Sequence, residues 1–100
     1  MELVIIQAKV STNQYFLSQH AIEEANAEDL DLTQIETAIL NGQILEQYTD
    51  TGRGPSCLIV GFADELPVHV VCGEKGDKIV VITVYVPKPP HFSDPWTRKN

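Results

Sequence analysis

The spacing of hydrophobic residues changes near residue 42 of this 100-residue chain. Before that point, apolar residues recur at intervals typical of helices that bury one side. After it they alternate with polar residues or form short runs, as in β-strands. The pattern predicts an α+β fold in which two or three N-terminal helices pack on one face of a four-stranded antiparallel sheet.

The first two helices are expected before residue 30. The segment from Glu2 to Thr12 has apolar residues at positions 3, 4, 6, 8 and 10, which fits a helix or a strand, and we favour a helix. Ser18 is placed to cap the next helix, because its hydroxyl accepts from a free N–H of the first turn. That short helix is predicted to include His20–Ala27.

The third helix has the clearest pattern. Residues 33–36, Thr-Gln-Ile-Glu, have the form of a capping box, and Asn41-Gly42 is expected to form a left-handed stop. Turn-rich segments then separate the four strands, which favours a meander of consecutive hairpins. The strands are predicted at residues 43–49, 56–63, 67–72 and 78–86.

Alternation within the last two strands predicts which side chains share a face. Val80, Ile82, Val84 and Val86 are predicted to face the core. His69 is then expected on the less apolar face, together with Thr83 and Tyr85.

The tail cannot continue the sheet, because its prolines lack N–H donors. Phe92 and Trp96 give it enough apolar surface to pack back against the rest of the chain. We therefore treat residues 1–100 as one domain, with a helical part at 1–42, a sheet at 43–86 and a proline-rich tail at 87–100.

Charge is divided unevenly along the chain. The formal net charge is −7, and residues 1–51 contribute −8 while residues 52–100 contribute +1. Any anionic ligand is therefore expected to bind the second half. No apolar run is long enough to span a membrane and no signal peptide pattern is present, so a cytoplasmic location and no membrane partner are expected.

Two cysteines, Cys57 and Cys72, lie in apolar strand-like runs and are predicted to be buried free thiols. The chain contains no C-x-x-C or H-x-x-x-H spacing. We therefore expect no metal site and no cofactor.

The order of several short motifs resembles that of a family of small bacterial proteins grouped with RelE-like and MqsR-like toxins. The resemblance covers roughly residues 15–100, and it is the order and spacing of the motifs that carry it. The matching residues are Ser18-x-His20-Ala21, Ala38-Ile39-Leu40-Asn41-Gly42, Leu58-Ile59-Val60-Gly61, Val68-His69-Val70-Val71, Val81-Ile82-Thr83-Val84-Tyr85, and Trp96 followed by Arg98.

The resemblance implies a fold like that of RelE and the microbial ribonucleases. It also implies a toxin of a type II toxin–antitoxin system that cleaves RNA without a metal ion, with a small antitoxin as its partner. RNA and a second copy of the chain are the other partners to consider. One departure is that Glu24 and Glu28 stand where relatives usually carry arginines, which favours an alternative, a catalytically inactive member that binds a protein.

Cleavage at a ribose 2′-hydroxyl requires a base, an acid and a cation. His69, Tyr85, Thr83 and His20 are the candidate catalytic residues. For His69 and Tyr85 the alternative is a hydrogen-bonded pair on a half-exposed sheet, and for His20 it is local packing at the start of a helix. The residues expected to bind substrate are Arg53, Arg98 and Trp96.

Overall fold

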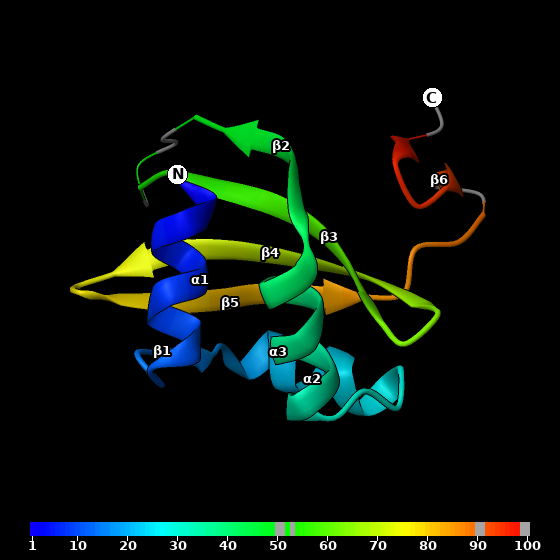
Figure 1. The fold of residues 1–100 in the computed structure, drawn as a ribbon, viewed down its shortest axis with the longest axis horizontal. Helices are drawn as coiled ribbons and strands as arrows, with labels where there is room; N and C mark the ends of the chain where they lie inside the picture. Colours follow the sequence, from blue (N-terminus) through cyan, green and yellow to red (C-terminus); the bar gives the residue numbers. More distant parts are fainter. Residues whose placement is uncertain (50–51, 53, 90–91, 99–100) are drawn as a thin grey trace.

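The computed structural model describes residues 1–49, 52, 54–89 and 92–98. Three helices precede most of the sheet, as predicted, and a two-stranded hairpin ends the described chain (Figure 1). The elements are α1 (Leu3–Ser11), β1 (Tyr15–Leu17), α2 (Gln19–Ala27), α3 (Leu32–Asn41), β2 (Gln43–Tyr48), β3 (Ser56–Ala63), β4 (Leu66–Lys75), β5 (Lys78–Tyr85), β6 (Phe92–Asp94) and β7 (Thr97–Arg98).

The main sheet has five strands in the order β1-β5-β4-β3-β2. Strands β2 to β5 form the predicted antiparallel meander, but the predicted count of four is wrong. The extra strand, β1, comes from the part predicted to be helical and runs parallel to β5, with Tyr15 opposite Ile79. Three residues are too few to show a two-residue period, so only the ladder with β5 reveals this strand.

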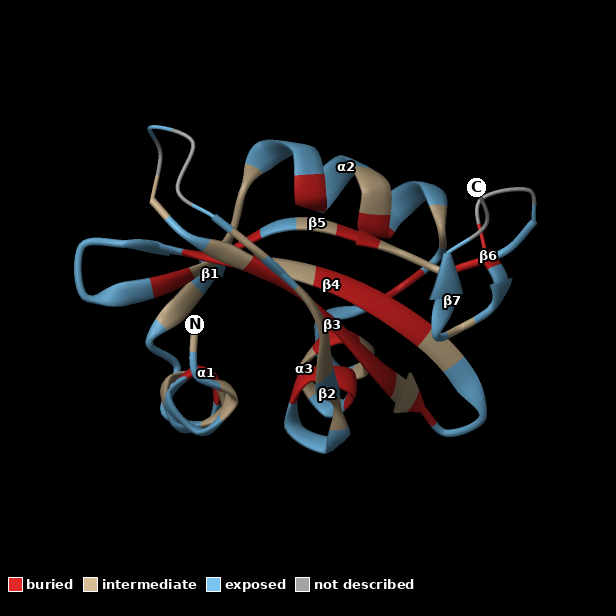
Figure 2. Ribbon diagram, turned by 90° about the horizontal axis from the view of Figure 1, so that it is seen from above, coloured by how far each residue is buried: buried red, intermediate tan, exposed pale blue. Residues whose placement is uncertain are grey.

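The helices are not all on one face of the sheet. Helices α1 and α3 lie on one side, and α2 lies on the other side beside β5 (Figure 2). The main core lies mostly between the sheet and helices α1 and α3, and Ala21 and Ala25 of α2 also belong to it. It includes Ile6 and Val10 of α1, Ile35 and Ile39 of α3, and Val70 of β4.

The predicted cap of α2 is confirmed, since the Ser18 hydroxyl accepts from the Ala21 N–H at 3.1 Å. The predicted capping box of α3 is wrong by two residues, because Asp31 and Gln34 form it instead of Thr33 and Glu36. Aspartate and threonine side chains both accept hydrogen bonds from the free N–H groups of a helix's first turn. Asp31 has this role because the backbone at Asp31 is still extended.

The predicted left-handed stop at Gly42 is also wrong. Its φ of −86° and ψ of −179° are extended, so α3 passes directly into β2. Glycine is required here for space, because a Cβ atom would lie 2.6 Å from the Ala38 carbonyl oxygen and 2.7 Å from that of Val60.

The predicted core face of β5 is wrong at its N-terminal end. Ile79 and Val81 are buried with Val84, whereas Ile82 is 38% exposed. The pairing between β4 and β5 shifts by one residue between Val71 and Cys72, and this bulge exchanges the faces along β5. Alternation alone cannot reveal such an extra residue.

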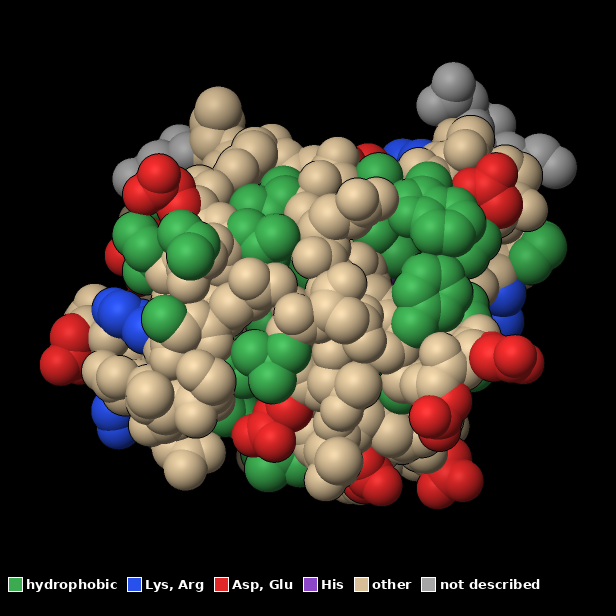
Figure 3. All heavy atoms as spheres, in the orientation of Figure 1, with side chains coloured by type: hydrophobic (Ala, Val, Ile, Leu, Met, Phe, Trp, Pro, Cys, Tyr) green, Lys and Arg blue, Asp and Glu red, His purple; other side chains and the backbone are tan. Residues whose placement is uncertain are grey.

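The prediction that the tail packs back on the sheet is confirmed. Phe92 is buried, and the Trp96 ring lies 5.7 Å from the Phe62 ring of β3. Figure 3 shows hydrophobic side chains gathered where this part of the molecule meets the sheet, with acidic side chains below them near the α2–α3 end. We call residues Phe92–Arg98 the C-terminal hairpin.

In the part of the chain that the structure describes, no helix has the length and apolar character required to cross a membrane.

Candidate functional site

His69 lies at the centre of the face opposite α1 and α3, which we call the second face. It is 0% exposed, although Val68 and Val70 on either side of it face the main core. Its Nε2 atom lies 2.5 Å from the carbonyl oxygen of Pro95, and its Nδ1 atom lies 3.3 Å from the Tyr85 hydroxyl. Both ring nitrogens are therefore occupied.

These two contacts define the protonation state of the imidazole. A carbonyl oxygen has no proton to donate, so Nε2 carries the hydrogen and donates it to Pro95. Nδ1 of the neutral ring then accepts from the hydroxyl of Tyr85. Burial holds the pKa of His69 below its ordinary value of 6.5, in agreement with a neutral ring.

An aromatic group surrounds the imidazole. The Phe92 ring meets the His69 ring edge-on with centroids 4.5 Å apart, and the Tyr85 ring lies 5.2 Å away. Tyr85 is directly opposite His69 in the β4–β5 ladder, so the sheet itself holds the pair together. Burial raises the pKa of Tyr85 above its ordinary value of 10.0, which keeps the hydroxyl protonated.

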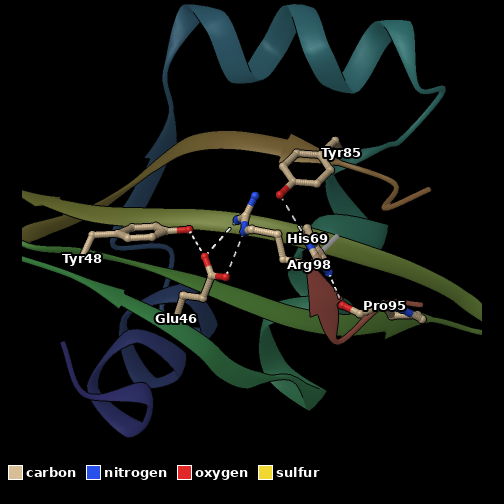
Figure 4. Close-up of polar contacts among 6 residues, drawn as sticks. All are labelled: Glu46, Tyr48, His69, Tyr85, Pro95 and Arg98. Atoms are coloured by element: carbon tan, nitrogen blue, oxygen red, sulfur yellow. Dashed lines mark hydrogen bonds and ion pairs between the residues drawn. The ribbon is translucent and has the colours of Figure 1, made fainter. Parts of the chain in front are cut away.

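An ion pair lies beside this histidine. The guanidinium of Arg98 donates to both carboxylate oxygens of Glu46, from Nε at 3.1 Å and from Nη2 at 2.9 Å. The Tyr48 hydroxyl donates to Glu46 Oε1 at 2.6 Å. Figure 4 shows the Arg98 side chain between Glu46 and Tyr85.

The ion pair also shifts the acidity of its members. The hydrogen bonds from Arg98 and Tyr48 hold the pKa of Glu46 below its ordinary value of 4.5, so its carboxylate is ionised. Burial and the bond to Glu46 raise the pKa of Tyr48 to about 12. We call Glu46, Tyr48, His69, Tyr85 and Arg98 the polar cluster.

A small apolar layer supports the polar cluster. Leu58 and Val60 of β3 are buried outside the main core, and the ladder places Val60 opposite His69. Phe92 of the C-terminal hairpin is buried against this layer, and the Arg98 guanidinium lies 4.9 Å from the centroid of its ring. The C-terminal hairpin therefore rests on both apolar and polar contacts.

One hollow adjoins the polar cluster. It has a volume of about 240 Å³, lies between α2 and the hairpin, and is lined by Tyr85, Phe92, Lys88 and Glu28 among others. A second hollow, of about 470 Å³, lies where Gly73 of β4 pairs with Val80 of β5, and no residue of the polar cluster lines it. The smaller hollow is therefore the one that opens beside a predicted site residue, Tyr85.

The structure brings together three of the predicted site residues, namely His69, Tyr85 and Arg98. Thr83 lies opposite Val71, two residues along β5 from Tyr85. Trp96 is on the hairpin and is 45% exposed. Arg53 lies outside the described residues.

His20 lies on α2 and is not joined to the polar cluster by any contact in the described part of the chain. Its side chain is 67% exposed, and its Nε2 atom lies 3.2 Å from Glu24 Oε1.

Glu46 and Tyr48 were missed by the sequence analysis. They are separated from His69 by more than twenty residues and lie in a strand whose polar positions look like ordinary surface residues. The only available signal is their spacing of two, which places both on one face of β2. The ladder with β3 then brings that face beside Leu58 and the C-terminal hairpin.

Glu24 and Glu28, the two acidic residues singled out in α2 and at its end, have structural partners. The Val84 N–H donates to Glu24 Oε1 at 3.3 Å, and the Val86 N–H donates to Glu28 Oε1 at 3.4 Å. Glu28 also pairs with Lys88 at 3.6 Å. The two glutamates therefore supply acceptors for backbone N–H groups at the end of β5 and just after it, where β1 no longer pairs with β5.

Cys57 and Cys72 are buried free thiols, as predicted, and lie opposite each other in the β3–β4 ladder. Burial raises the pKa of Cys72, which keeps it protonated. No three His, Cys, Asp or Glu side chains within the described residues are close enough to hold a metal ion.

A family model described as Domain of unknown function (DUF4258) matches residues 17–86. The chain belongs to this family. The matched DUF4258 region contains Glu46, His69 and Tyr85, whereas Arg98 and the rest of the C-terminal hairpin lie beyond it. No curated protein and no solved structure gave a significant match.

Proposed function

We propose that this DUF4258 protein is a metal-independent endoribonuclease of the toxin type, with the polar cluster as its active site. The observation that carries the proposal is the convergence of Glu46, His69, Tyr85 and Arg98 from four different strands on one face of the sheet. They provide a carboxylate, an imidazole, a phenol and a guanidinium. These groups are sufficient for cleaving RNA through its own 2′-hydroxyl.

In the proposed reaction the 2′-oxygen attacks the adjacent phosphorus and the bond from phosphorus to the 5′-oxygen breaks. The products are a 2′,3′-cyclic phosphate and a free 5′-hydroxyl. Glu46 accepts the proton of the 2′-hydroxyl, since its low pKa keeps it ionised. His69 gives its Nε2 proton to the leaving 5′-oxygen while Nδ1 takes the hydroxyl proton of Tyr85, so the ring is neutral before and after the step. Exchange with solvent then returns the proton held by Glu46 to Tyr85.

Arg98 is proposed to stabilise the charge that develops on the phosphate oxygens. Its guanidinium has the planar geometry that matches a phosphate, and it already lies beside Glu46. The exposed ring of Trp96 is suited to stack on a base of single-stranded RNA. Thr83 lies two residues before Tyr85 in β5 and is proposed to contact the substrate.

The toxin role places the protein in the cytoplasm with a small antitoxin as its partner. The formal net charge of −7 predicts that the chain binds RNA weakly in general, because RNA is itself an anion. Recognition then depends on the few groups of the polar cluster.

The test is RNA cleavage by purified protein in the presence of a metal chelator. Wild type should convert RNA to fragments with 2′,3′-cyclic phosphate ends, and Glu46→Gln should lower the rate by about 100-fold. Glu65→Gln is the matched control, because Glu65 is exposed in the β3–β4 turn and changes the charge equally. If folded wild type leaves RNA intact, or if both variants cleave equally, the ribonuclease proposal is wrong.

The second candidate is a non-catalytic module that binds another protein. It is favoured by the burial of His69, whose two ring nitrogens and whose aromatic neighbours are all engaged within the chain. In this case Glu46→Gln lowers stability without affecting any RNA, since the polar cluster only anchors the hairpin. Measuring the unfolding of this variant together with its RNA cleavage separates the two functions.

A further inference from the structure

We propose that the C-terminal hairpin is a lid that closes the polar cluster and must lift from β4 before a substrate reaches His69. That the substrate is RNA rests on the proposed function. The movement of the hairpin is inferred from its contacts, and its test needs no RNA.

The closed hairpin blocks the proposed proton donor. Nε2 of His69 is the nitrogen directed away from Tyr85, and the Pro95 carbonyl oxygen lies 2.5 Å from it. Phe92 covers the ring edge-on, and no part of the histidine is exposed. A leaving oxygen cannot approach Nε2 unless Pro95 and Phe92 move away.

The hairpin is not part of the main sheet. Strands β6 and β7 pair only with each other among the described strands. The contacts that hold them to the body include the ring contact of Trp96 with Phe62, the ion pair of Arg98 with Glu46, and the contacts on His69. The Phe92 N–H also donates to the Lys88 carbonyl oxygen of the preceding segment at 3.3 Å. Lifting the hairpin breaks these contacts but no ladder of backbone hydrogen bonds.

The stem that leads to the hairpin, Pro87 and Lys88, is fixed to the body. Pro87 is buried, and Lys88 pairs with Glu28, the C-cap of α2, at 3.6 Å. The stem is therefore held on the body just before the hairpin begins. The hairpin can turn about this fixed stem without disturbing β5.

The closed lid also keeps the two charged groups of the site engaged with each other. Glu46 accepts from Arg98 and Tyr48, so its oxygens are occupied in the closed state. An anionic phosphate competes with Glu46 for Arg98, because both present oxygens to the same guanidinium. Substrate binding therefore favours the open lid and releases Glu46 to act as a base.

The experiment measures how fast diethyl pyrocarbonate modifies His69, followed by mass spectrometry of the peptides. His20 is the internal standard, because its side chain is 67% exposed whether the lid is open or closed. Alkylation of the buried thiols Cys57 and Cys72 reports global unfolding. Each rate is divided by the rate of the same group in the urea-unfolded chain, because the two reagents have different intrinsic rates. On this scale we expect His69 to react more slowly than His20 and at least about tenfold faster than the thiols, as for local opening.

A disulfide lock provides the matched variant. The double substitution Phe62→Cys and Trp96→Cys places two thiols where two rings with centroids 5.7 Å apart now meet. Because a disulfide needs Cα atoms within about 7 Å of each other, mass spectrometry must first show that oxidation has joined the two thiols. The oxidised protein should show His69 modification slowed by about tenfold, and a reductant should restore it. Equal His69 rates in the two states, or a wild-type rate equal to that of the thiols, would overturn the lid.

RNA cleavage by the same locked protein distinguishes the two proposals. Loss of cleavage on oxidation and recovery on reduction supports both. Equal cleavage in the two states means that the hairpin is not a lid, although the ribonuclease stands. If the modification of His69 follows the lock but RNA stays intact in both states and with wild type, the lid stands and the proposed function fails. Cleavage by wild type but by neither state of the variant means that the proposed Trp96 contact is essential, and the modification of His69 alone then decides the lid.

Discussion

The Nε2 atom of His69 lies 2.5 Å from the carbonyl oxygen of Pro95, although 26 residues separate them in the sequence. This bond, the bond to Tyr85 and the burial of the ring make His69 a neutral group within a small second core. A proton added to the ring removes the acceptor that Tyr85 uses and places a charge in that core. The stability of the chain should therefore respond to pH.

We expect the free energy of unfolding to fall as pH is lowered below about 6.5. Burial holds the pKa of folded His69 below 6.5. As the pH falls, the unfolded chain therefore binds a proton at a higher pH than the folded chain does, and stability is lost between pH 6.5 and the folded pKa. Above 6.5 this group has no effect. Urea unfolding of wild type and His69→Gln between about pH 7.5 and about pH 5 measures the difference.

The variant provides the control, because it removes the imidazole of His69 and leaves the other ionisable side chains of the sequence in place. His69→Gln should show a weaker loss of stability in this range. Glu46 acts at lower pH, since its folded pKa lies below 4.5 and its contribution is lost as pH falls through that folded pKa. The same pH dependence in both proteins would contradict the assignment of a buried neutral His69.

The three tyrosines should all resist ionisation in the folded state. Burial raises the pKa of Tyr15, Tyr48 and Tyr85 above the ordinary value of 10.0, and carboxylates of Glu36 and Glu46 accept from Tyr15 and Tyr48. Folded protein should therefore show little phenolate absorbance at about pH 10.5, where a free tyrosine is mostly ionised. The raised pKa values also mean that stability is lost as pH rises above 10.

Absorbance near 295 nm with far-UV circular dichroism at each pH measures this directly. Phenolate should appear together with the loss of the fold. The appearance of phenolate in a chain that keeps its secondary structure would show that at least one hydroxyl is free.

Gly61 should not tolerate a side chain. A Cβ atom there would lie 1.8 Å from the Ala38 carbonyl oxygen and within 3 Å of two more backbone atoms of α3. Gly61→Ala should therefore lower the free energy of unfolding by about 3 kcal/mol, because the helix must move off β3. Chemical denaturation of the purified variant is the measurement.

Gly73→Ala is the matched control in the neighbouring strand. Its Cβ atom would meet Ile82 Cδ1 at 2.9 Å, and the end of that partly exposed side chain can move aside. We expect a loss of about 1 kcal/mol or less. Equal losses at the two glycines would mean that the contact between α3 and β3 is not the tight one described here.

Much of the fold could be predicted from local patterns. The run Ser56–Ala63 was predicted with its exact bounds, because it is a continuous apolar segment between turn-forming residues. Strand β1 could not be predicted, because its three residues form a strand only through pairing with Ile79–Val81. The faces of β5 were partly wrong because a bulge depends on the partner strand.

The candidate site divides in the same way. Alternation within the two strands predicts that His69 and Tyr85 share a face, because alternation is local. That they lie directly opposite each other is seen only in the ladder. The roles of Glu46 and of Pro95 depend on where the C-terminal hairpin folds back, which has no periodic signal. A backbone carbonyl has no identity in the sequence, so a contact such as that of Pro95 is visible only in the structure.

The acidic residues of α2 provide the last prediction. Glu24 accepts from the Val84 N–H at 3.3 Å, at the part of β5 that β1 does not reach. Glu24→Ala should lower the free energy of unfolding by about 1 kcal/mol, whereas Glu24→Gln keeps an acceptor oxygen and should lose less. Urea denaturation of both variants measures the difference.

Glu23→Ala is the control, because Glu23 is exposed on the same helix and should change stability by less than about 0.5 kcal/mol. The ordering of the three variants decides what the acidic residues do. If Glu24→Ala behaves like Glu23→Ala, the carboxylate is free to serve a partner. If it is destabilised and Glu24→Gln is not, the glutamate is retained to close the edge of β5, and arginine at this position would remove that acceptor.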